Sequence, residues 1–232
     1  VVPKTKKEAL DRLAKAGRSR AFGIRMKEEN AYMFAALQAL LNTCAVSFDL
    51  PILEWIQAHL QCGFLDKAMP IVTLFGDGGV FWILVAVTLL FFAKYRKTGF
   101  SMGMALVLGL LVCNIILKPQ VARIRPYTFQ LEHFQKEITL LISAQSDFSF
   151  PSGHTIASFE ACTVLMLHDK RMGIPATVLA ILIAFSRLYL YVHYPTDVLV
   201  SLVLGILFGL LGNLLVNLIY KKFVYKGKYI EE

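Results

Sequence analysis

Residues 198–220 read VLVSLVLGILFGLLGNLLVNLIY, a run of 23 residues without a charged side chain. A helix needs about 20 mostly apolar residues to cross the hydrocarbon core of a bilayer, so this stretch predicts a membrane-spanning helix. The whole composition agrees: 56% of the 232 residues are hydrophobic and only 17% are charged, compared with about 25% charged residues in ordinary soluble domains. We therefore expect a membrane protein rather than a soluble one.

Five further segments are candidates for crossing the membrane. Four are predominantly apolar: residues 69–93, 100–117, 155–167 with the preceding turn, and 174–192. Residues 31–48 also contain Gln38, Asn42 and Thr43, so hydropathy alone does not decide whether they cross. If they do, the pattern predicts an all-α protein with a six-span transmembrane helical bundle over residues 31–220.

The basic residues favour six spans and orient them. With the N-terminus inside, the cytoplasmic side would receive 18 of the 24 Lys and Arg residues, nine of them in a basic leader at residues 1–30 and others in a tail at residues 221–232. Cytoplasmic segments of membrane proteins carry such an excess. We expect a cell-membrane protein with both termini in the cytoplasm. The leader could be a helix on anionic lipid or a solvated tail.

Residues 49–64 connect the first two predicted spans. Ile52, Leu53, Ile56 and Leu60 recur at helical spacing within them. This pattern predicts a short amphipathic helix, which could lie at the outer membrane interface or serve as a packed connecting helix.

Several classes of site are not expected. A net charge of +8 could indicate a nucleic-acid partner, but membrane orientation already explains where the basic residues lie. Cys44, Cys62, Cys113 and Cys162 lack paired metal-ligand spacing, and three of them lie in apolar stretches. The sequence therefore predicts no nucleic-acid binding, no metal site, no cofactor and no disulfide framework. Nothing in it indicates an oligomeric state.

The first of three polar motifs, KPQVARIRP at residues 118–126, follows the third predicted span. Pro119 suits the first turn of a short helix and Pro126 would end it. On such a helix Lys118 and Arg125 would face the same way, whereas Arg123 would point elsewhere. Two cations on one face suit a phosphate, although cations at a helix end can also reach lipid headgroups.

The second motif, FPSGH at residues 150–154, opens the fourth predicted span. Ser152 can cap the helix, and Gly153 lets an anion approach the backbone N–H groups closely. His154 would project from the first turn, where it could donate a proton to a leaving oxygen. An ordinary capped helix start would explain Ser152 and Gly153 equally well.

The third motif, SRLYLYVHYPTD at residues 186–197, joins the last two predicted spans. Arg187 is costly to bury near the end of a span and is therefore a functional candidate. Asp197 lies four residues after His193, so its carboxylate could accept one imidazole N–H and orient the other nitrogen as a nucleophile. A structural His–Asp bridge between two helices is the alternative. All three motifs fall at the outer ends of predicted spans, which predicts one active site facing outward.

In this order, K-x6-RP, PSGH and SR-x5-H-x3-D resemble the motifs of the type-2 phosphatidic acid phosphatase superfamily. The resemblance extends from about residue 49 to the sixth predicted span and leaves the leader outside. It implies a metal-independent enzyme that removes phosphate from a lipid, as bacterial phosphatidylglycerophosphate and undecaprenyl pyrophosphate phosphatases do. The sequence FGDGG at residues 75–79 also resembles a family feature. We expect its glycines to serve close helix packing rather than a phosphate loop.

The resemblance implies a role for each motif residue. His193 would attack phosphorus to form a phosphohistidine, Asp197 would orient it, and His154 would protonate the leaving lipid oxygen and later activate water. The implied phosphate ligands are Lys118, Arg125, Ser152, Gly153 and Arg187, with Arg123 as a weaker addition. Cations and helix N–H groups of this kind stabilise the charge on a transferring phosphoryl group.

The motifs are compatible with several lipid phosphates as the substrate. Undecaprenyl pyrophosphate, phosphatidylglycerol phosphate and phosphatidic acid present similar phosphate ends, and the expected partners are one of these lipids and the surrounding membrane lipids. A lipid phosphotransferase of the same family is an alternative, because an alcohol can replace water as acceptor. A membrane transporter would place ionisable residues near the bilayer midplane, whereas the three motifs lie at span ends.

Overall fold

The computed structural model describes residues 32–224, and every regular element in that range is helical. Residues 32–44 are α-helical, and the further α-helices are α2 (Leu50–Leu60), α3 (Gly63–Leu74), α4 (Val80–Phe91), α5 (Arg96–Gly109), α6 (Lys118–Val121), α7 (Pro126–Phe134), α8 (Gly153–His168), α9 (Lys170–Tyr189) and α10 (Pro195–Ile219). Short 3₁₀ or π elements are η1 (Ala45–Asp49), η2 (Asp77–Gly79), η3 (Leu110–Leu117) and η4 (Tyr220–Val224). The all-α prediction is confirmed for this range. The predicted leader, residues 1–30, and residues 225–232 of the predicted tail lie outside it.

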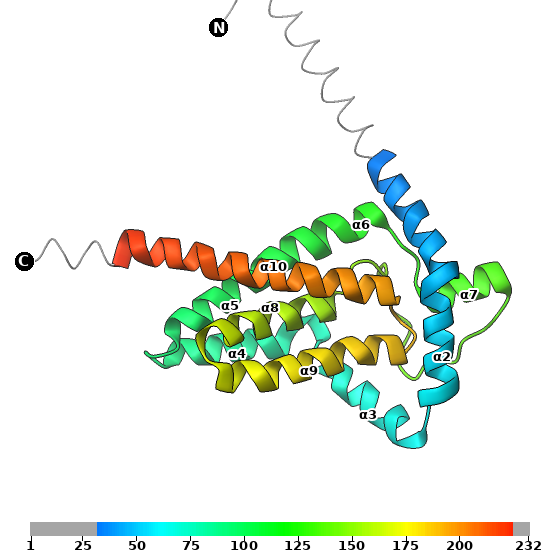
Figure 1. The fold of residues 1–232 in the computed structure, drawn as a ribbon, viewed down its shortest axis with the longest axis horizontal. Helices are drawn as coiled ribbons and strands as arrows, with labels where there is room; N and C mark the ends of the chain where they lie inside the picture. The colour runs from blue at the N-terminus through cyan, green and yellow to red at the C-terminus, as the bar shows by residue number, and fades with distance from the viewer. Residues whose placement is uncertain (1–31, 225–232) are drawn as a thin grey trace, which may run out of the picture.

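Five helices, α4, α5, α8, α9 and α10, form an elongated bundle (Figure 1). α8 packs against α5, α9 and α10, and most of its side chains are buried. Glycines allow the closest approach: a methyl group at Gly205 would lie 2.7 Å from the Cβ of Phe159, and one at Gly209 would lie 2.8 Å from the Cβ of Thr163. Such small residues at helix contacts are typical of membrane bundles.

The outer surface of the bundle is apolar. On α10, Leu199, Val203, Leu207 and Leu214 are each more than half exposed. An apolar surface of this extent suits hydrocarbon rather than water. Five helical segments are long and apolar enough to cross a membrane: Tyr32–Leu60, Gly63–Phe91, Arg96–Phe134, Lys170–Tyr189 and Pro195–Lys222. These segments support the prediction of a multi-pass membrane protein.

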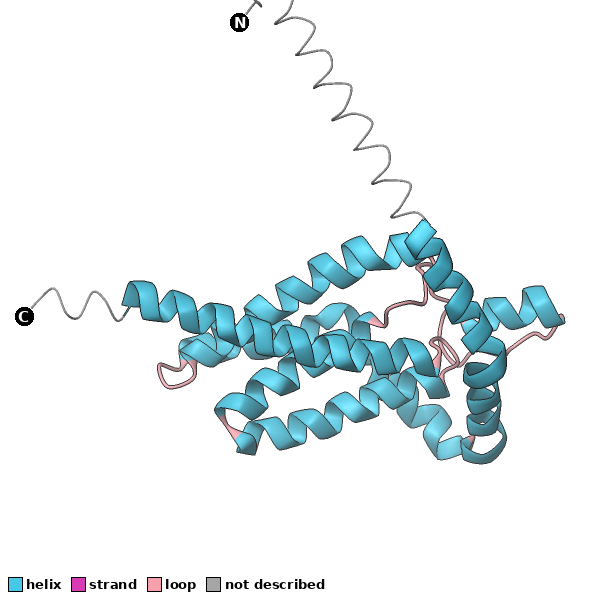
Figure 2. Cartoon of the chain, turned by 45° about the horizontal axis from the view of Figure 1, so that its top comes forward, coloured by secondary structure: helices cyan, strands magenta, loops and turns pink. Residues whose placement is uncertain are grey.

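The predicted first and fourth spans differ from the other four. The fourth corresponds to α8, whose 16 residues are slightly fewer than the roughly 17 that a crossing helix needs. The first continues through η1 into α2 as one helical segment, Tyr32–Leu60, which runs across one end of the bundle (Figures 1 and 2). Its length permits a crossing, but its direction differs from that of the bundle helices. The predicted order of six spans is therefore not confirmed.

α2 is packed against the protein, as one of the two alternatives for residues 49–64 requires. Leu50, Leu53 and Ile56 are almost fully buried. Leu53 belongs to a core cluster with Tyr191, and Ile56 to one with Tyr189. α2 thereby covers the end of the bundle where α9 leads into α10.

The second predicted span, residues 69–93, is not one helix. α3 ends at Leu74 and α4 begins at Val80, with a turn between them in which Gly78 and Gly79 have φ values of +55° and +68°. Glycine adopts this conformation without steric cost. The expected close packing applies instead to Gly76, where a Cβ would lie 2.6 Å from Cδ2 of His154.

The basic turns gather at the opposite end of the bundle from α2. The α4–α5 turn, the α8–α9 junction and the end of α10 lie together there (Figure 1). These segments carry Lys94, Lys97, Lys170, Arg171 and Lys221. The three polar motifs occupy the other end, so the structure separates them from the basic turns by the length of the bundle.

Candidate active site

A cavity of about 800 Å³ brings the three motifs together. Six of the nine predicted site residues line it: Lys118, Arg125, Gly153, His154, Arg187 and His193. The other three, Arg123, Ser152 and Asp197, lie behind its wall. Beyond the polar end, the cavity continues along α4, α5, η3 and α8, where its lining is mostly apolar.

The short helix predicted to begin at Lys118, with Pro119 in its first turn, is present as α6, but its predicted extent to Pro126 is wrong. α6 ends after one turn, Ala122 has a left-handed conformation with φ at 50°, and Pro126 begins α7 instead of ending a helix. Lys118 and Arg125 nevertheless meet. Lys118 Nζ lies 2.5 Å from Oδ2 of Asp147, and Arg125 Nη2 lies 2.5 Å from Oδ1 of the same carboxylate.

The carboxylate of Asp147 lies between Lys118 and Arg125, the two cations that were expected to bind a phosphate. Asp147 belongs to the irregular segment between α7 and α8, and its side chain is half exposed. Its partial burial opposes ionisation, but Lys118 and Arg125 outweigh this effect and hold the pKa of the Asp147 carboxyl below its ordinary value. This part of the cavity therefore stabilises negative charge.

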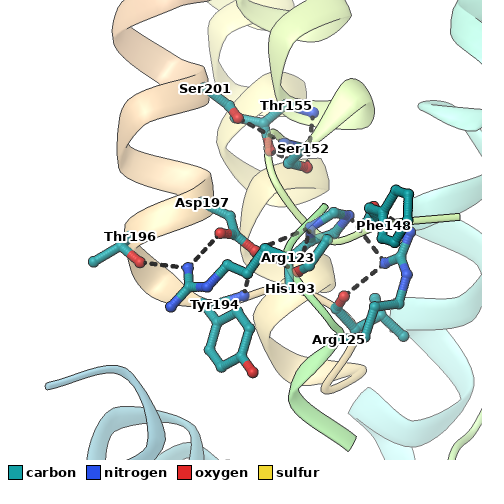
Figure 3. Close-up of polar contacts among 12 residues, drawn as sticks. Arg123, Arg125, Phe148, Ser152, Thr155, His193, Tyr194, Thr196, Asp197 and Ser201 are labelled. Atoms are coloured by element: carbon teal, nitrogen blue, oxygen red, sulfur yellow. Dashed lines mark hydrogen bonds and ion pairs between the residues drawn. The ribbon is translucent and has the colours of Figure 1, made fainter. Parts of the chain in front are cut away.

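His193 lies in the connection between α9 and α10 and is 1% exposed. Its Nδ1 lies 3.5 Å from Oδ2 of Asp197, and its Nε2 lies 3.3 Å from Nη1 of Arg125 (Figure 3). Burial, followed by the charges of Arg125 and Arg187, lowers the pKa of His193, so the ring is neutral at pH 7. Nε2 is therefore the ring nitrogen on the cationic side, next to Arg125.

Asp197 is fixed by several groups besides the histidine. Ser149 Oγ donates to its Oδ2 at 2.5 Å, and the Tyr194 N–H donates to the same oxygen at 3.1 Å. The contact with Nδ1 of His193, at 3.5 Å, is longer than an ordinary hydrogen bond. The structure thus places the predicted partners next to each other without a direct hydrogen bond.

Arg123 does not line the cavity, and its guanidinium lies beside Asp197 (Figure 3). Its Nη1 donates to Asp197 at 2.5 Å and to Thr196 at 2.8 Å, while its Nη2 donates to Asp49 at 2.8 Å. Its guanidinium carbon lies 3.7 Å from the ring centre of Tyr194. Both terminal nitrogens are therefore occupied by protein groups, which favours a positioning role over phosphate contact.

The start of α8 has the predicted cap. Ser152 Oγ accepts from the N–H of Thr155 at 3.5 Å and from its hydroxyl at 3.0 Å, and the Ser152 N–H donates to Ser201 Oγ at 2.8 Å (Figure 3). Its side chain is fully buried. Ser152 therefore fixes the first turn of α8, and it leaves the next residue, Gly153, to line the cavity.

His154 has a partner that was not predicted. Its Nε2 lies 2.7 Å from Oδ1 of Asp77 in the α3–α4 turn. The bare backbone of Gly76 lies against the same ring, where a Cβ would overlap it. This turn therefore both makes room for the imidazole and supplies a carboxylate for it.

Arg187 differs from the other cations of the site. It is 1% exposed and lines the cavity. Its Nη1 donates to Thr73 Oγ1 at 2.6 Å, but its Nε and Nη2 have no hydrogen-bond partner among the described residues. A buried guanidinium with two free nitrogens offers a planar donor pair to an anion.

Several partners of the site residues were not predicted, among them Asp49, Asp77, Asp147 and Ser149. The position of Asp77 within FGDGG was a usable signal, because a charged residue inside a predicted span is a functional candidate. Asp49 directly follows the first apolar stretch and offered a similar signal. Asp147 and Ser149 lie in a polar segment in which nothing singles them out.

The family model of the PAP2 superfamily matches residues 98–221, which is more than half of the chain. An undecaprenyl-diphosphatase from Sulfolobus acidocaldarius is 32% identical over 161 residues, which cover 69% of this chain and 74% of that protein. Phosphatidylglycerophosphatase B from Bacillus subtilis is 31% identical over 188 residues, which cover 75% of this chain and 86% of that protein.

Two solved structures have a similar fold. The crystal structure of Aquifex aeolicus LpxE has a TM-score of 0.62 and 26% identity, and covers 72% of this chain and 94% of its own. The crystal structure of a transmembrane PAP2-type phosphatidylglycerolphosphate phosphatase from Bacillus subtilis has a TM-score of 0.61 and 27% identity. The match covers 84% of this chain and 96% of that protein's chain. The relatives are named as phosphatases, so the predicted class of phosphoric ester hydrolase is confirmed. By sequence and by fold, the chain belongs to the PAP2 superfamily.

Proposed function

We propose that this protein is an integral-membrane lipid phosphatase that hydrolyses a phosphate monoester or a pyrophosphate of a lipid. The observation that carries the proposal is the buried guanidinium of Arg187: this residue lines the cavity, and two of its nitrogens have no hydrogen-bond partner within residues 32–224. Lys118 and Arg125 line the same end of the cavity. Three cations around one space suit a ligand with several anionic oxygens, as a phosphate has.

The remainder of the cavity supports a lipid as the carrier of that phosphate. Its lining includes Ile83, Val87 and Leu90 of α4, Met104 and Val107 of α5, and Leu110 of η3. These side chains form an apolar wall that begins where the cationic end stops. An amphiphile with a phosphate at one end and hydrocarbon at the other matches both parts.

The proposed reaction has two steps. First, Nε2 of His193 attacks phosphorus, so that a P–N bond forms as the P–O bond to the lipid breaks and the lipid oxygen takes a proton from His154. Then His154 removes a proton from water, which attacks phosphorus and displaces His193, so that inorganic phosphate leaves. Lys118, Arg125 and Arg187 stabilise the phosphoryl charge in both steps.

Residues behind the cavity wall position the reacting groups in this proposal. Arg123 and Ser149 hold the carboxylate of Asp197 against His193. Asp77 holds the ring of His154. Ser152 fixes the helix start that carries His154, and the backbone of Gly153 borders the phosphate position.

The relatives named undecaprenyl-diphosphatase and phosphatidylglycerophosphatase B support both polyprenyl and glycerolipid substrates. The test is phosphate release by the purified protein in detergent from undecaprenyl pyrophosphate, phosphatidylglycerol phosphate and phosphatidic acid. We expect His193→Ala to abolish release, because the proposed reaction has no other nucleophile. His133→Ala is a matched control, since His133 stacks on Phe129 outside the cavity. Release above a few per cent in His193→Ala would refute the proposal, and phosphoryl capture by an added alcohol would identify a transferase.

We also propose that the active site faces the outside of the cell membrane. The basic turns lie at the opposite end of the bundle, and basic segments are typical of the cytoplasmic side. In a variant without the four native cysteines, Gln135→Cys should react with a membrane-impermeant maleimide in intact cells. Lys94→Cys, in the α4–α5 turn, should react only after the membrane is opened. The reverse pattern would place the site inside.

The number of spans is tested by the same method. Six spans put the leader on the cytoplasmic side, whereas a first helical segment that stays on the outer surface would leave the leader outside. We propose six spans on the basis of the nine basic residues of the leader. Ala16→Cys should then be protected in intact cells, and labelling in intact cells would show that the first segment does not cross.

A further inference from the structure

Glu160 is an acidic residue in the cavity wall that the proposed reaction does not use. It lies on α8, is 1% exposed, and its Oε1 has no hydrogen-bond partner among the described residues. The ion pairs of residues 32–224 do not include it. A Cβ at Gly109 would lie 1.9 Å from Oε1, so the carboxyl occupies space that only a glycine leaves free on α5. Both residues line the cavity.

The surroundings of Glu160 determine what it can bind. An unpaired carboxylate in apolar surroundings is strongly disfavoured, so this group is buried as the neutral acid. A neutral carboxylic acid carries one O–H donor. A buried donor without an acceptor is also unfavourable, and the space that Glu160 borders is the cavity, which it lines. Its natural ligand is therefore an uncharged hydrogen-bond acceptor on a molecule in the cavity.

The position along α8 identifies which part of a lipid would reach it. Glu160 follows His154 by six residues, which corresponds to about 9 Å along a helix axis. Helical side chains lean towards the N-terminal end, which brings the carboxyl closer to His154 than the backbone positions are. If the phosphate of a lipid lies at the cationic end of the cavity, the part of the lipid that reaches Glu160 therefore lies a few bonds beyond the phosphate. In a diacylglycerol phosphate this part includes two ester carbonyl oxygens, whereas in a polyprenyl phosphate it is hydrocarbon.

We propose that Glu160 donates a hydrogen bond to an acyl ester carbonyl of the substrate and so selects glycerolipid phosphates over polyprenyl phosphates. This inference rests on the proposed lipid phosphatase function and adds the substrate class. A polyprenyl chain leaves the donor of Glu160 unsatisfied in the complex, whereas an ester carbonyl satisfies it. Gly109 then has a definite purpose, which is to leave room for the carboxyl in the cavity wall.

The test compares two synthetic lipids that differ only at the carbonyls, diacylglycerol phosphate and its dialkyl ether analogue. Phosphate release is measured for the full-length protein in the same detergent, and the ester-to-ether ratio of kcat/KM is calculated for each variant. This ratio cancels differences in the amount of folded enzyme. We expect a ratio of about ten for the unmodified protein, the factor that corresponds to one hydrogen bond. Glu160→Gln, which keeps an N–H donor, should retain most of it, and Glu160→Met should reduce it to less than about two.

The outcomes distinguish the role of Glu160 from the phosphatase function. A ratio near one in the unmodified protein, or an unchanged high ratio in Glu160→Met, would overturn the role of Glu160 while leaving the phosphatase intact. No phosphate release from any lipid by the unmodified protein would overturn the proposed function itself and this inference with it. Glu160→Leu provides the same comparison if Glu160→Met does not fold. A loss of the ratio in Met or Leu together with its retention in Gln would establish the hydrogen bond.

Discussion

Arg123 and Arg187 are both buried arginines at the same end of the bundle, and their surroundings differ in one respect. Arg123 is matched by two carboxylates, Asp49 and Asp197, and both its terminal nitrogens are occupied. Arg187 has a neutral hydroxyl, Thr73, on one nitrogen and no partner among the described residues on two others. Arg187 lines the cavity, whereas Arg123 does not.

This difference separates a charge that holds the protein together from one that awaits a ligand. Burying an ion is expensive, and removal of one partner from a buried pair leaves the other uncompensated. A buried cation without an anion carries that cost until a ligand supplies the missing charge. Mutation of Arg123 should therefore change the stability of the protein, whereas mutation of Arg187 should change catalysis.

The largest effect is expected for Arg123→Met. It leaves Asp49 and Asp197 buried without their cation and should lower the free energy of unfolding by about 3–5 kcal/mol. Thermal unfolding of the purified protein in detergent measures the change. The exposed Arg171→Met is the matched control and should unfold as the unmodified protein does. Equal melting temperatures for the two variants would show that the Arg123 network is not needed for stability.

Arg187→Met should have the opposite profile. Loss of a cation from the phosphoryl site should reduce kcat/KM by about 10² to 10³, as the loss of an electrostatic donor to a transition state does. Stability should be unchanged or higher, because no carboxylate loses its partner. A variant that unfolds earlier but retains normal kcat/KM would reverse the distinction between the two arginines. Arg187→Lys should recover part of the activity, since it restores the charge without the planar donor pair.

Asp77→Asn tests a third pairing, between a carboxylate and the proposed general acid. It should reduce the rate on a lipid substrate by about tenfold, a fraction of the 10² to 10⁴ that general acid catalysis contributes. The loss should be smaller with p-nitrophenyl phosphate, whose leaving group needs no proton. Equal losses on both substrates would indicate that Asp77 acts on folding or on phosphate binding instead.

Asp147→Asn extends the comparison to Lys118 and Arg125, two cations that are already paired with the carboxylate of Asp147. A substrate phosphate must share Lys118 and Arg125 with this carboxylate, so its removal should lower KM by about threefold to tenfold through stronger charge-assisted contacts. Steady-state kinetics on the preferred lipid measure the effect. An increase in KM would mean that Asp147 helps to place the two cations rather than competes for them.

The smallest expected change concerns pH. The pKa of His193 is lowered by burial first and then by cations that include Arg187. The neutral ring is the active form, so kcat/KM should persist as pH falls through the ordinary histidine range and be lost only below it. Arg187→Met removes one cause of the lowering, and the acid limb of its pH profile should shift to higher pH. An identical limb in both proteins would show that another group sets it.

Sequence patterns predicted the residues of the cavity because each motif is local and lies at the end of an apolar stretch. His193, His154 and Arg187 needed only their own neighbours to be recognised. Their partners depend on distances in space: Asp49 is 74 positions from Arg123, and Asp77 is 77 positions from His154. No helical periodicity relates residues that far apart.

Local geometry also limited the prediction. Proline is compatible both with the first turn of a helix and with the residue after its end, and Pro126 proved to begin α7. The break between α3 and α4 arises from glycines with positive φ inside an apolar run. Hydropathy could not distinguish it from a continuous span. The direction of the segment Tyr32–Leu60 depends on how α2 packs, which a count of apolar residues does not contain.

The contact between α8 and α10 has a consequence for how the site responds to different substrates. Gly205 and Gly209 let the two helices touch, and the Ser152 N–H, at the N-cap of α8, donates to Ser201 Oγ in the N-terminal half of α10. α8 carries His154 and α10 carries Asp197, so both halves of the proposed proton and phosphoryl chemistry belong to one pre-organised helix pair. Asp147 belongs instead to an irregular segment. Selection among substrates can therefore evolve in that segment and along the apolar wall without any change in the spacing of the reacting groups.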